Sequence, residues 1–292
     1  MKIVVAGGSG FLGEPLVARF RERGDQVDVL SRSASKGLEW HPPAQGAWSA
    51  QVAAADVVVN LAGENIGDGR WTAERKKRLI ASRLDATRAL VAAMQSQPSK
   101  QRTFVSASAT GWYGDRGDET LDESAARGTG FLSDLTQEWE SAARAAEPVA
   151  RVVIPRFGVV LEKSGGALAK MLPPFRLGAG GPLGSGRQWM PWVDREDALR
   201  FVLWAIDTPA ARGVYNVSAP EPVRNRDFTK ELGRALHRPA VLPAPAFALR
   251  LAFGEMADEA LLGGQRVVPA RAMAEGFAFR YPRLGEALAH IL

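Results

Sequence analysis

Short continuous runs of apolar residues alternate with segments of helical spacing in the first half of the chain. The run "KIVVA" at residues 2–6 ends in glycines, and "FLGEPLVARFRERG" at 11–24 follows with helical spacing that Gly24 should end. Similar β-branched runs lie at 26–32, 56–63, 102–108 and 150–161. Strands without polar alternation are typical of parallel sheets covered on both faces. The pattern predicts an α/β fold with a Rossmann-type, doubly wound parallel sheet.

Two long amphipathic patterns predict helices at 71–95 and 130–146. In the first, apolar positions recur every three to four residues, at Leu79, Ile80, Leu84, Thr87, Leu90 and Val91. After about residue 161 the pattern loosens. A glycine-rich loop at 178–187 precedes a helix that Asp194 should cap, with Asp197 near its third position. A strand at 213–219 and a helix that starts at Asn225 follow. We expect a large domain at 1–161 and a smaller, discontinuous C-terminal lobe at 162–292, parts of which return to the sheet.

Composition excludes several kinds of protein. The chain has 292 residues and no cysteine, so disulfides, thiolate nucleophiles and cysteine-bound metals are impossible. The three histidines lie far apart in sequence, and we expect no metal site. No apolar run is long enough to cross a membrane or to form a signal peptide. The net charge of +5 raises nucleic-acid binding, but the densest basic run, Glu74 to Arg78, fits a solvated helix face. We expect a cytoplasmic protein that binds neither nucleic acid nor membrane.

The turn after the first predicted strand carries a phosphate-binding pattern. "VVAGGSGFLG" places Gly7, Gly10 and Gly13 at three-residue spacing between a strand and a helix. Small residues here allow a tight turn, close approach of a pyrophosphate and close helix packing, while the helix N-terminus offers free N–H groups. The alternative is a glycine turn without a ligand. The context at the start of a βαβ unit favours a dinucleotide.

The end of the second predicted strand distinguishes between cofactors. An NAD site usually has an acidic residue there to bind the ribose hydroxyls. This chain has Ser31 and Arg32 instead, and the guanidinium can bind a 2′-phosphate. Arg32 could also be an ordinary surface residue, but the pattern favours NADP (NADPH) over NAD. Leu61, Ala62 and Gly63 end a further core strand, where small residues would let adenosine lie across the sheet edge. Taken alone, these residues could equally be an ordinary strand end.

Together, "GGSGFLG", "NLAG", "SASATGWYG" and "GSGRQWMPWVDREDAL" resemble the extended, epimerase-like branch of the short-chain dehydrogenase/reductase superfamily over nearly the whole chain. "NLAGENI" and "PPFRLGAGGPLGSGRQWMPW" look like an atypical "epimerase family" subgroup. The resemblance implies that backbone of Ser9, Phe11 and Leu12 assists the glycines at the pyrophosphate, and that Ser108 matches the catalytic serine. It also implies further cofactor contacts at Arg83, Ser106, Pro155, Val159 and Val160. Arg83 could equally form a helix-surface ion pair.

The superfamily's proton-transferring Tyr-x-x-x-Lys pair is missing. The three tyrosines, Tyr113, Tyr215 and Tyr281, have no lysine four residues later. Aligned on Glu140, the expected tyrosine falls at Leu132 and the expected lysine at Thr136. Tyr113 could substitute, with a pKa near ~10 unless a cation lies nearby. The alternatives are a packing role for Tyr113 and a backbone-bonding role for Ser108.

Arginine and tryptophan side chains point to a substrate region. Arg156 and Arg187 could bind an anionic group, and Trp189 could stack on a ring, although tryptophans are often core residues. The leading hypothesis is an NADP(H)-dependent oxidoreductase or epimerase-like enzyme with a non-standard acid/base and an unidentified small substrate. The alternative is a non-catalytic NADP(H)-binding redox sensor or regulatory protein. Analogy with extended relatives suggests a homodimer through helices at 72–97 and 131–147.

Overall fold

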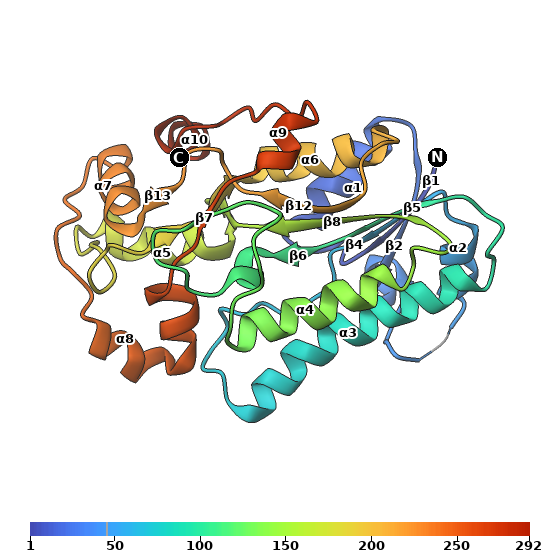
Figure 1. Ribbon diagram of the computed structural model, residues 1–292, viewed down its shortest axis with the longest axis horizontal. Coiled ribbons are helices and arrows are strands. Elements are labelled where there is room, and N and C mark those ends of the chain that lie inside the picture. Colours follow the sequence, from blue (N-terminus) through green and yellow to red (C-terminus); the bar gives the residue numbers. More distant parts are fainter. Residues whose placement is uncertain (45) are drawn as a thin grey trace.

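A computed structural model describes residues 1–44 and 46–292 (Figure 1). Its main sheet is parallel throughout, with the order β12-β8-β5-β4-β1-β2-β3 and a short β6 beside β8. The strands are β1 (Lys2–Ala6), β2 (Gln26–Ser31), β3 (Leu38–Glu39), β4 (Val57–Asn60), β5 (Thr103–Ser106), β6 (Ser108–Ala109), β8 (Arg151–Phe157) and β12 (Gly213–Val217). The predicted α/β fold with a Rossmann-type parallel sheet is confirmed.

Helices cover both faces of this sheet, which explains why its strands lack polar alternation. On one face lie α1 (Gly13–Glu22) and α6 (Arg195–Asp207), and on the other α2 (Trp48–Ala54), α3 (Ala73–Gln95) and α4 (Phe131–Arg144) (Figure 1). Val5 and Val153 pack with Phe20 and Phe201 in one buried cluster. The neighbouring positions Val4 and Val58 pack with Trp48 and Leu90 in another. Successive strand residues therefore serve opposite layers of the core.

Helix boundaries follow the capping signals closely. Asp194 caps α6 by accepting a hydrogen bond from the Glu196 amide at 2.7 Å, as predicted. Thr72 caps α3 by accepting from the Arg75 amide at 3.1 Å. The helix expected at 11–24 runs only from Gly13 to Glu22, and Gly24 follows with φ +84°. That left-handed conformation suits glycine and ends the helix.

The single strand predicted at 150–161 is wrong, because Gly158 divides it into two strands. β8 ends at Phe157, and β9 (Val159–Glu162) leaves the main sheet to pair with β11 (Trp192–Asp194). A Cβ atom at Gly158 would lie 2.6 Å from the Pro191 carbonyl oxygen. The close backbone contact that only glycine permits brings the 190–194 segment beside the end of β8.

The remaining elements lie mostly at the carboxyl ends of the strands, where they form a lobe (Figure 1). Helices α5 (Gly166–Arg176), α7 (Asn225–Ala235) and α10 (Leu284–Ile291) share a separate buried cluster. The lobe also contains α8 (Ala246–Phe253), η3 (Ala257–Leu262), α9 (Ala270–Ala274), β10 (Trp189–Met190) and β13 (Val223–Arg224). The structure is completed by short turns and strands: η1 (Ala34–Lys36), η2 (Thr110–Tyr113), β7 (Thr120–Leu121) and β14 (Arg266–Val267). β12 and α6 return to the sheet, so the lobe is not one continuous stretch of chain.

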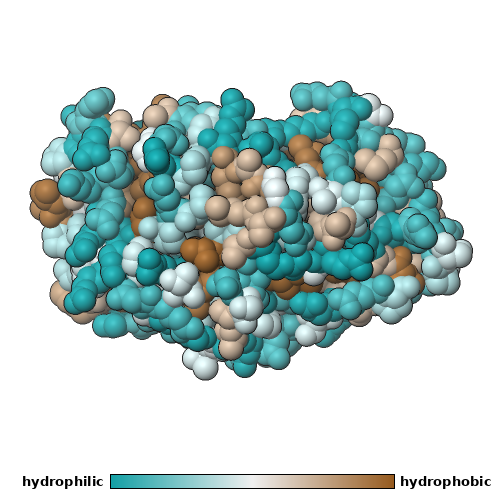
Figure 2. Space-filling view, turned by 45° about the horizontal axis from the view of Figure 1, so that its top comes forward, coloured by the Kyte–Doolittle hydropathy of each residue, from teal (hydrophilic) through white to brown (hydrophobic). Residues whose placement is uncertain are grey.

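The surface is mixed in polarity. Across the face shown in Figure 2, hydrophobic residues form separate small groups among hydrophilic ones. None of the helices in the described part of the chain combines the length and the apolar character that a membrane span requires.

Candidate functional site

The strand order contains one reversal, and this point defines a crevice. The chain passes from β1 outward to β2 and β3, then crosses back to place β4 on the other side of β1. The loops after β1 and β4 therefore run in opposite directions and leave a gap at the carboxyl edge. In open α/β sheets ligands bind at such a switch point. The predicted glycine turn and the "LAG" loop form its two sides.

Gly7 and Gly13 of the turn serve packing, whereas Gly10 is exposed. A Cβ at Gly7, which has φ +77°, would lie 2.8 Å from the Leu61 carbonyl carbon. A Cβ at Gly13 would lie 2.1 Å from the Gly7 oxygen. At Gly10, whose backbone is exposed, a Cβ would meet only the Gly7 oxygen, at 3.2 Å. The arrangement fits a pyrophosphate that approaches the backbone at Ser9 and Gly10 and the N-terminus of α1.

The two side chains that follow the glycines have different surroundings. Leu12 packs against the main hydrophobic cluster. Phe11 lies beside Gly165 and Gly166, where Cβ atoms would come within 2.7 and 3.3 Å of its ring. The backbone of both residues stays at the start of α1, as the sequence predicts.

At the end of β2, the guanidinium of Arg32 is available to bind a ligand. Ser31 is nearly buried, and its hydroxyl oxygen accepts a hydrogen bond from the Ser33 amide at 3.2 Å. Arg32 is exposed, and its guanidinium makes no hydrogen bond or ion pair with residues 1–44 or 46–292. Ser33 is also exposed, and its hydroxyl lies 2.9 Å from that of Ser35. Arg32 can therefore bind an anion without breaking an internal contact.

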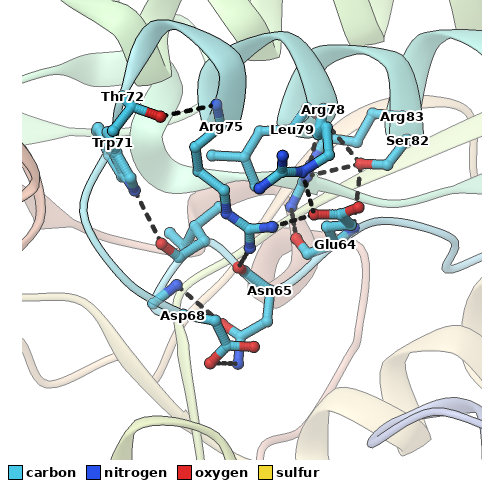
Figure 3. Close-up of polar contacts among 12 residues, drawn as sticks. Glu64, Asn65, Asp68, Trp71, Thr72, Arg75, Arg78, Leu79, Ser82 and Arg83 are labelled. Atoms are coloured by element: carbon cyan, nitrogen blue, oxygen red, sulfur yellow. Dashed lines mark hydrogen bonds and ion pairs between the residues drawn. The ribbon is translucent and has the colours of Figure 1, made fainter.

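The loop after β4 is held by side chains of α3 (Figure 3). The first amides of the loop make hydrogen bonds. The Leu61 amide donates to the Ala6 carbonyl at 2.9 Å, and the Ala62 amide donates to the Asn60 side chain at 3.2 Å. Arg83 donates to the carbonyl oxygens of Glu64 at 3.0 Å and Leu79 at 3.2 Å. Burial lowers the pKa of Arg83 to about 10. Its donors thus support the loop, and Gly63 lies against its guanidinium.

Further contacts fix the same loop (Figure 3). Arg75 pairs with the Glu64 carboxylate and donates to the Asn65 carbonyl at 2.6 Å. The Trp71 indole N–H donates to the Ile66 carbonyl at 2.8 Å. These bonds link the loop to the first turns of α3. The side of the crevice formed by this loop is therefore held in place before any ligand binds.

Ser106 lies below the surface of the crevice. It is fully buried and accepts a hydrogen bond from the Asn60 side-chain amide at 3.2 Å. The same amide donates to Thr87 at 2.9 Å, and the Trp139 indole donates to Thr87 at 3.0 Å. The Ser106 side chain thus belongs to a buried network between β4, β5, α3 and α4.

The predicted catalytic serine is joined to a buried ion pair. Ser108 donates from its hydroxyl to Glu140 Oε1 at 2.7 Å. Glu140 also accepts from Arg156 Nε at 2.7 Å and from Nη2 at 2.9 Å. The side chains of Arg156 and Glu140 are only 3% and 2% exposed. The serine proton and two guanidinium donors therefore all point to one carboxylate.

Tyr113 belongs to the same network. Its hydroxyl accepts from Arg156 Nη1 at 3.0 Å and lies 2.8 Å from Asn216 Oδ1 and 2.9 Å from the Asp122 carbonyl. The ring is fully buried. Burial raises the pKa of Tyr113, although the nearby Arg156 opposes the shift. The pKa of Tyr113 thus departs from the ordinary value expected without a nearby cation, and the cation beside its hydroxyl is Arg156.

The helix that normally carries the proton-transfer pair offers no titratable replacement at those positions. Leu132, Thr136 and Glu140 follow one another at four-residue intervals along α4. Thr136 donates from its hydroxyl to the Leu132 carbonyl at 2.8 Å. The amides of Phe131 and Leu132 donate to the Glu259 carboxylate at 2.7 and 2.8 Å. The first turn of α4 is thus tied to η3 of the lobe.

The expected nicotinamide and substrate residues lie on separate elements. Pro155 is on β8 opposite Tyr215, while Val159 and Val160 on β9 pair with Trp192 and Val193. The guanidiniums of Arg224 and Arg266 lie 4.4 and 4.9 Å from the centroid of the Trp189 ring. Its indole N–H donates to Asp118 at 2.7 Å. Arg187 is exposed, and its carbonyl accepts from Arg224.

Arg156 does not join Arg187 and Trp189. It stacks on the Trp112 ring at 4.0 Å and borders a separate open depression of about 810 Å³ next to β12 and α9. Within the parts of the chain that the structure describes, His, Asp and Glu side chains nowhere form a group of three or more that could hold a metal ion.

Comparison with known proteins identifies the family. The model of the NAD-dependent epimerase/dehydratase family matches residues 3–218. The chain belongs to this family. A domain of unknown function, DUF1731, matches residues 244–291. Epimerase family protein Mb2239 of Mycobacterium bovis is 42% identical over 292 residues, which cover 99% of this chain and 96% of that protein. The human epimerase family protein SDR39U1 is 37% identical over the whole of both chains.

Solved structures agree with this assignment. The crystal structure of human SDR39U1 (isoform 2) with NADPH has a TM-score of 0.90 and 36% identity, and it covers 100% of this chain and 99% of its own. The Thermus thermophilus UDP-glucose 4-epimerase in complex with NAD has a TM-score of 0.75, with 100% and 97% covered. At 18% identity, the latter shows the shared fold alone. The predicted epimerase-like short-chain dehydrogenase/reductase membership is confirmed.

Sequence reasoning missed several residues that shape the site. Glu140 serves there only to align the helix, yet it joins Ser108 to Arg156. Its position on the buried face of an amphipathic helix is the signal that could have revealed a charged partner. Glu64 and Glu259, which fix the loop after β4 and the start of α4, have no local signal of that kind.

Proposed function

We propose that this family member binds NADPH at the β1–β4 switch point, with Arg32 and Ser31 at the 2′-phosphate. Three features support the proposal: the open backbone at Gly10, the exposed guanidinium of Arg32, and the NADPH in the crystal structure of the similar human protein. The exposed position of Arg32 is the observation that favours NADP over NAD. A guanidinium without an internal partner can donate two parallel hydrogen bonds to a phosphate.

The other residues expected to contact the cofactor are consistent with the same binding position. Gly7 and Gly13 hold the turn, while the backbone of Ser9, Phe11 and Leu12 borders the pyrophosphate. Leu61, Ala62 and Gly63 border the adenosine, and Pro155, Val159 and Val160 the nicotinamide. The polar groups of Arg83 and Ser106 already have internal partners. Arg83 therefore supports the cofactor indirectly, by holding the loop after β4, and Ser106 does so by accepting a hydrogen bond from Asn60. The bound cofactor would supply or accept hydride.

The cofactor choice is tested by fluorescence titration with NADPH and NADH. Arg32→Asp should weaken NADPH binding by roughly tenfold to a hundredfold, as expected for loss of a charge-assisted hydrogen bond, and should favour NADH. Arg21→Asp makes the same charge change on an exposed position of α1 and should leave both affinities unchanged. Tighter NADH binding by the wild type would contradict the role of Arg32.

For the reaction, we propose an NADP(H)-dependent oxidoreductase or epimerase-like enzyme acting on an unidentified small molecule near Arg187 and Trp189. Ser108 and Tyr113 remain the proposed polar groups, and Arg156 links them, because it donates to Tyr113 and to the Glu140 carboxylate that accepts from Ser108. The second candidate is a non-catalytic NADP(H)-binding sensor or regulator. It is favoured by the buried network, in which the hydroxyls of Ser108 and Tyr113 have internal partners.

The two candidates differ in turnover. Protein loaded with NADPH can be offered a panel of carbonyl compounds and quinones while absorbance is followed. Oxidation that Ser108→Ala and Tyr113→Phe reduce supports the enzyme, whereas no oxidation supports the sensor. A cytoplasmic location, a two-domain division at residue 161 and a homodimer through α3 and α4 are further proposals. Size-exclusion chromatography with light scattering tests the dimer.

A further inference from the structure

The segment that leads from β9 into α5 touches both loops that border the crevice. One contact is to Phe11 in the turn after β1, and the other is to Gly67 and Asp68 in the loop after β4. These loops are far apart in sequence and lie on opposite sides of the switch point. Residues 163–170 therefore span the gap between the two sides of the proposed NADPH site.

At the Phe11 end, the contact is apolar and close. A Cβ at Gly165 would lie 2.7 Å from the Phe11 ring, and one at Gly166, which has φ +66°, would lie 3.3 Å away. Only glycine lets the segment lie on the ring with this backbone. The Arg195 guanidinium lies 5.5 Å from the ring centroid and pairs with Glu162 at 2.7 Å. This end is therefore fixed by packing and by a largely covered ion pair.

At the other end, the contact is polar and exposed. Lys170 on the second turn of α5 donates to the Gly67 carbonyl at 2.8 Å and to Asp68 Oδ1 at 2.7 Å. The Asn65 side-chain amide donates to the same Asp68 oxygen at 3.1 Å. Arg75 holds Asn65 in turn, so the acceptor side of the contact is fixed to α3 (Figure 3).

The two ends differ in strength. The side chains of Lys170 and Asp68 are 54% and 58% exposed, so water competes for both partners. An exposed ion pair of this kind contributes little to stability and breaks readily. The contact at Phe11 is apolar and partly buried, so water does not compete for a hydrogen bond there. The segment can thus open at Lys170 while it stays attached at Gly165 and Gly166.

We propose that residues 163–170 form a strap across the cofactor crevice, closed by a clasp of Lys170 on Asp68 and Gly67 that limits the rate of NADPH release. The inference rests on the proposed NADPH site. Lys170 is a positioning residue here, because it acts by holding the strap and the loop after β4 together. An intact clasp lengthens the time for which the cofactor stays bound, and opening it lets the dinucleotide leave.

Stopped-flow displacement of NADPH from the full-length protein tests the strap. Lys170→Asp and Asp68→Lys should each raise the dissociation rate constant by about threefold to tenfold, the range for losing an exposed ion pair with one charged hydrogen bond. The double charge reversal Lys170→Asp with Asp68→Lys restores the ion pair but not the hydrogen bond to the Gly67 carbonyl, so it should return the rate part of the way to the wild-type value. Lys170→Arg keeps the donor and should restore a rate near that of the wild type. Lys163→Asp, on the same segment and exposed, is the matched control and should leave the rate unchanged.

Ionic strength gives a second measurement. Raising the NaCl concentration from 0.05 to about 0.5 M shortens the Debye length to a few ångströms and should speed release from the wild type more than from Lys170→Asp. Equal dissociation rates in all variants, with normal NADPH binding, would overturn the strap alone, and so would single variants that neither the double reversal nor Lys170→Arg corrects. A wild type that binds no NADPH would overturn the proposed function, and the strap with it.

Discussion

The crevice at the β1–β4 switch point and the network around Glu140 both contain residues that the sequence predicts to be functional, but they are built in opposite ways. In the crevice, Gly10 is exposed, with the Gly7 oxygen as its one close neighbour, and Arg32 has no partner in the described part of the chain. In the network, Ser108, Tyr113 and Arg156 bond to one another or to Glu140 and Asn216. One region leaves donors for a ligand, while the other uses its donors internally.

The difference shows what each region can do without further change. Free backbone groups at a helix N-terminus bind an anion at little cost, because no internal bond has to break. Ser108 can give its proton to a substrate only if it leaves Glu140, and that would leave a buried carboxylate with one donor fewer. The cofactor side is therefore ready for its ligand, and the proton-transfer side acts first as structure.

The largest expected effect comes from breaking the network. Glu140→Gln removes the charge that pairs with Arg156 and leaves a buried guanidinium without a counter-ion. Loss of one partner from a buried pair costs about 3–5 kcal/mol. Denaturant unfolding should show that loss, whereas Glu138→Gln, exposed on the same helix, should cost less than about 0.5 kcal/mol. A small effect of Glu140→Gln would mean that the pair is not as closed as its 2–3% exposure indicates.

A smaller effect should come from filling the open side of the crevice. Gly10→Ala places a methyl group where the pyrophosphate is expected, with the Gly7 oxygen as its one close neighbour at 3.2 Å. NADPH affinity should fall by about tenfold, equivalent to ~1.4 kcal/mol. The free energy of unfolding without cofactor should change little. Isothermal titration and denaturant unfolding measure the two quantities separately.

Two other glycines calibrate that experiment. Gly13→Ala should destabilise the protein itself, because its Cβ would overlap the Gly7 oxygen at 2.1 Å. A Cβ at Gly285, in α10, would meet nothing closer than 3.8 Å. Gly285→Ala should therefore lower neither the NADPH affinity nor the free energy of unfolding. If Gly10→Ala instead lowers stability and leaves NADPH affinity unchanged, the open side of the turn is not the binding side.

The sequence predicted the crevice better than the network, for a physical reason. Glycine spacing, the strand-to-helix context and Arg32 are local features, so each can be recognised from neighbouring residues in the sequence. The contacts of Glu140 to Ser108 and to Arg156 join residues 32 and 16 positions apart, and the fold alone brings them together. Gly158 shows the same limit, because its break in the predicted strand depends on Pro191, which belongs to another segment.

The last prediction concerns the tyrosines and pH, and its substitution, Tyr113→Phe, has the smallest expected effect. Burial raises the pKa of Tyr113, and burial followed by the hydrogen bond to Glu275 raises that of Tyr215 to about 12. The folded state thus favours the neutral phenol. This stabilisation is complete below the ordinary value near ~10 and is lost as the pH rises through the folded-state values. The free energy of unfolding should therefore fall between about pH 10 and pH 12.

Tyr113→Phe isolates the contribution of the network to that fall. The variant should lose about 1 kcal/mol at pH 7, because Arg156 and Asn216 each lose a hydrogen-bond partner, and it should depend less steeply on alkaline pH. Arg83, whose pKa burial lowers to about 10, titrates in wild type and variant alike, so it cancels in the difference. NADPH affinity at pH 7 should stay the same. A tyrosinate absorbance that appears well below pH 10 in the wild type and is absent from Tyr113→Phe would instead make Tyr113 an activated acid/base, and the two regions would then both be prepared for a ligand.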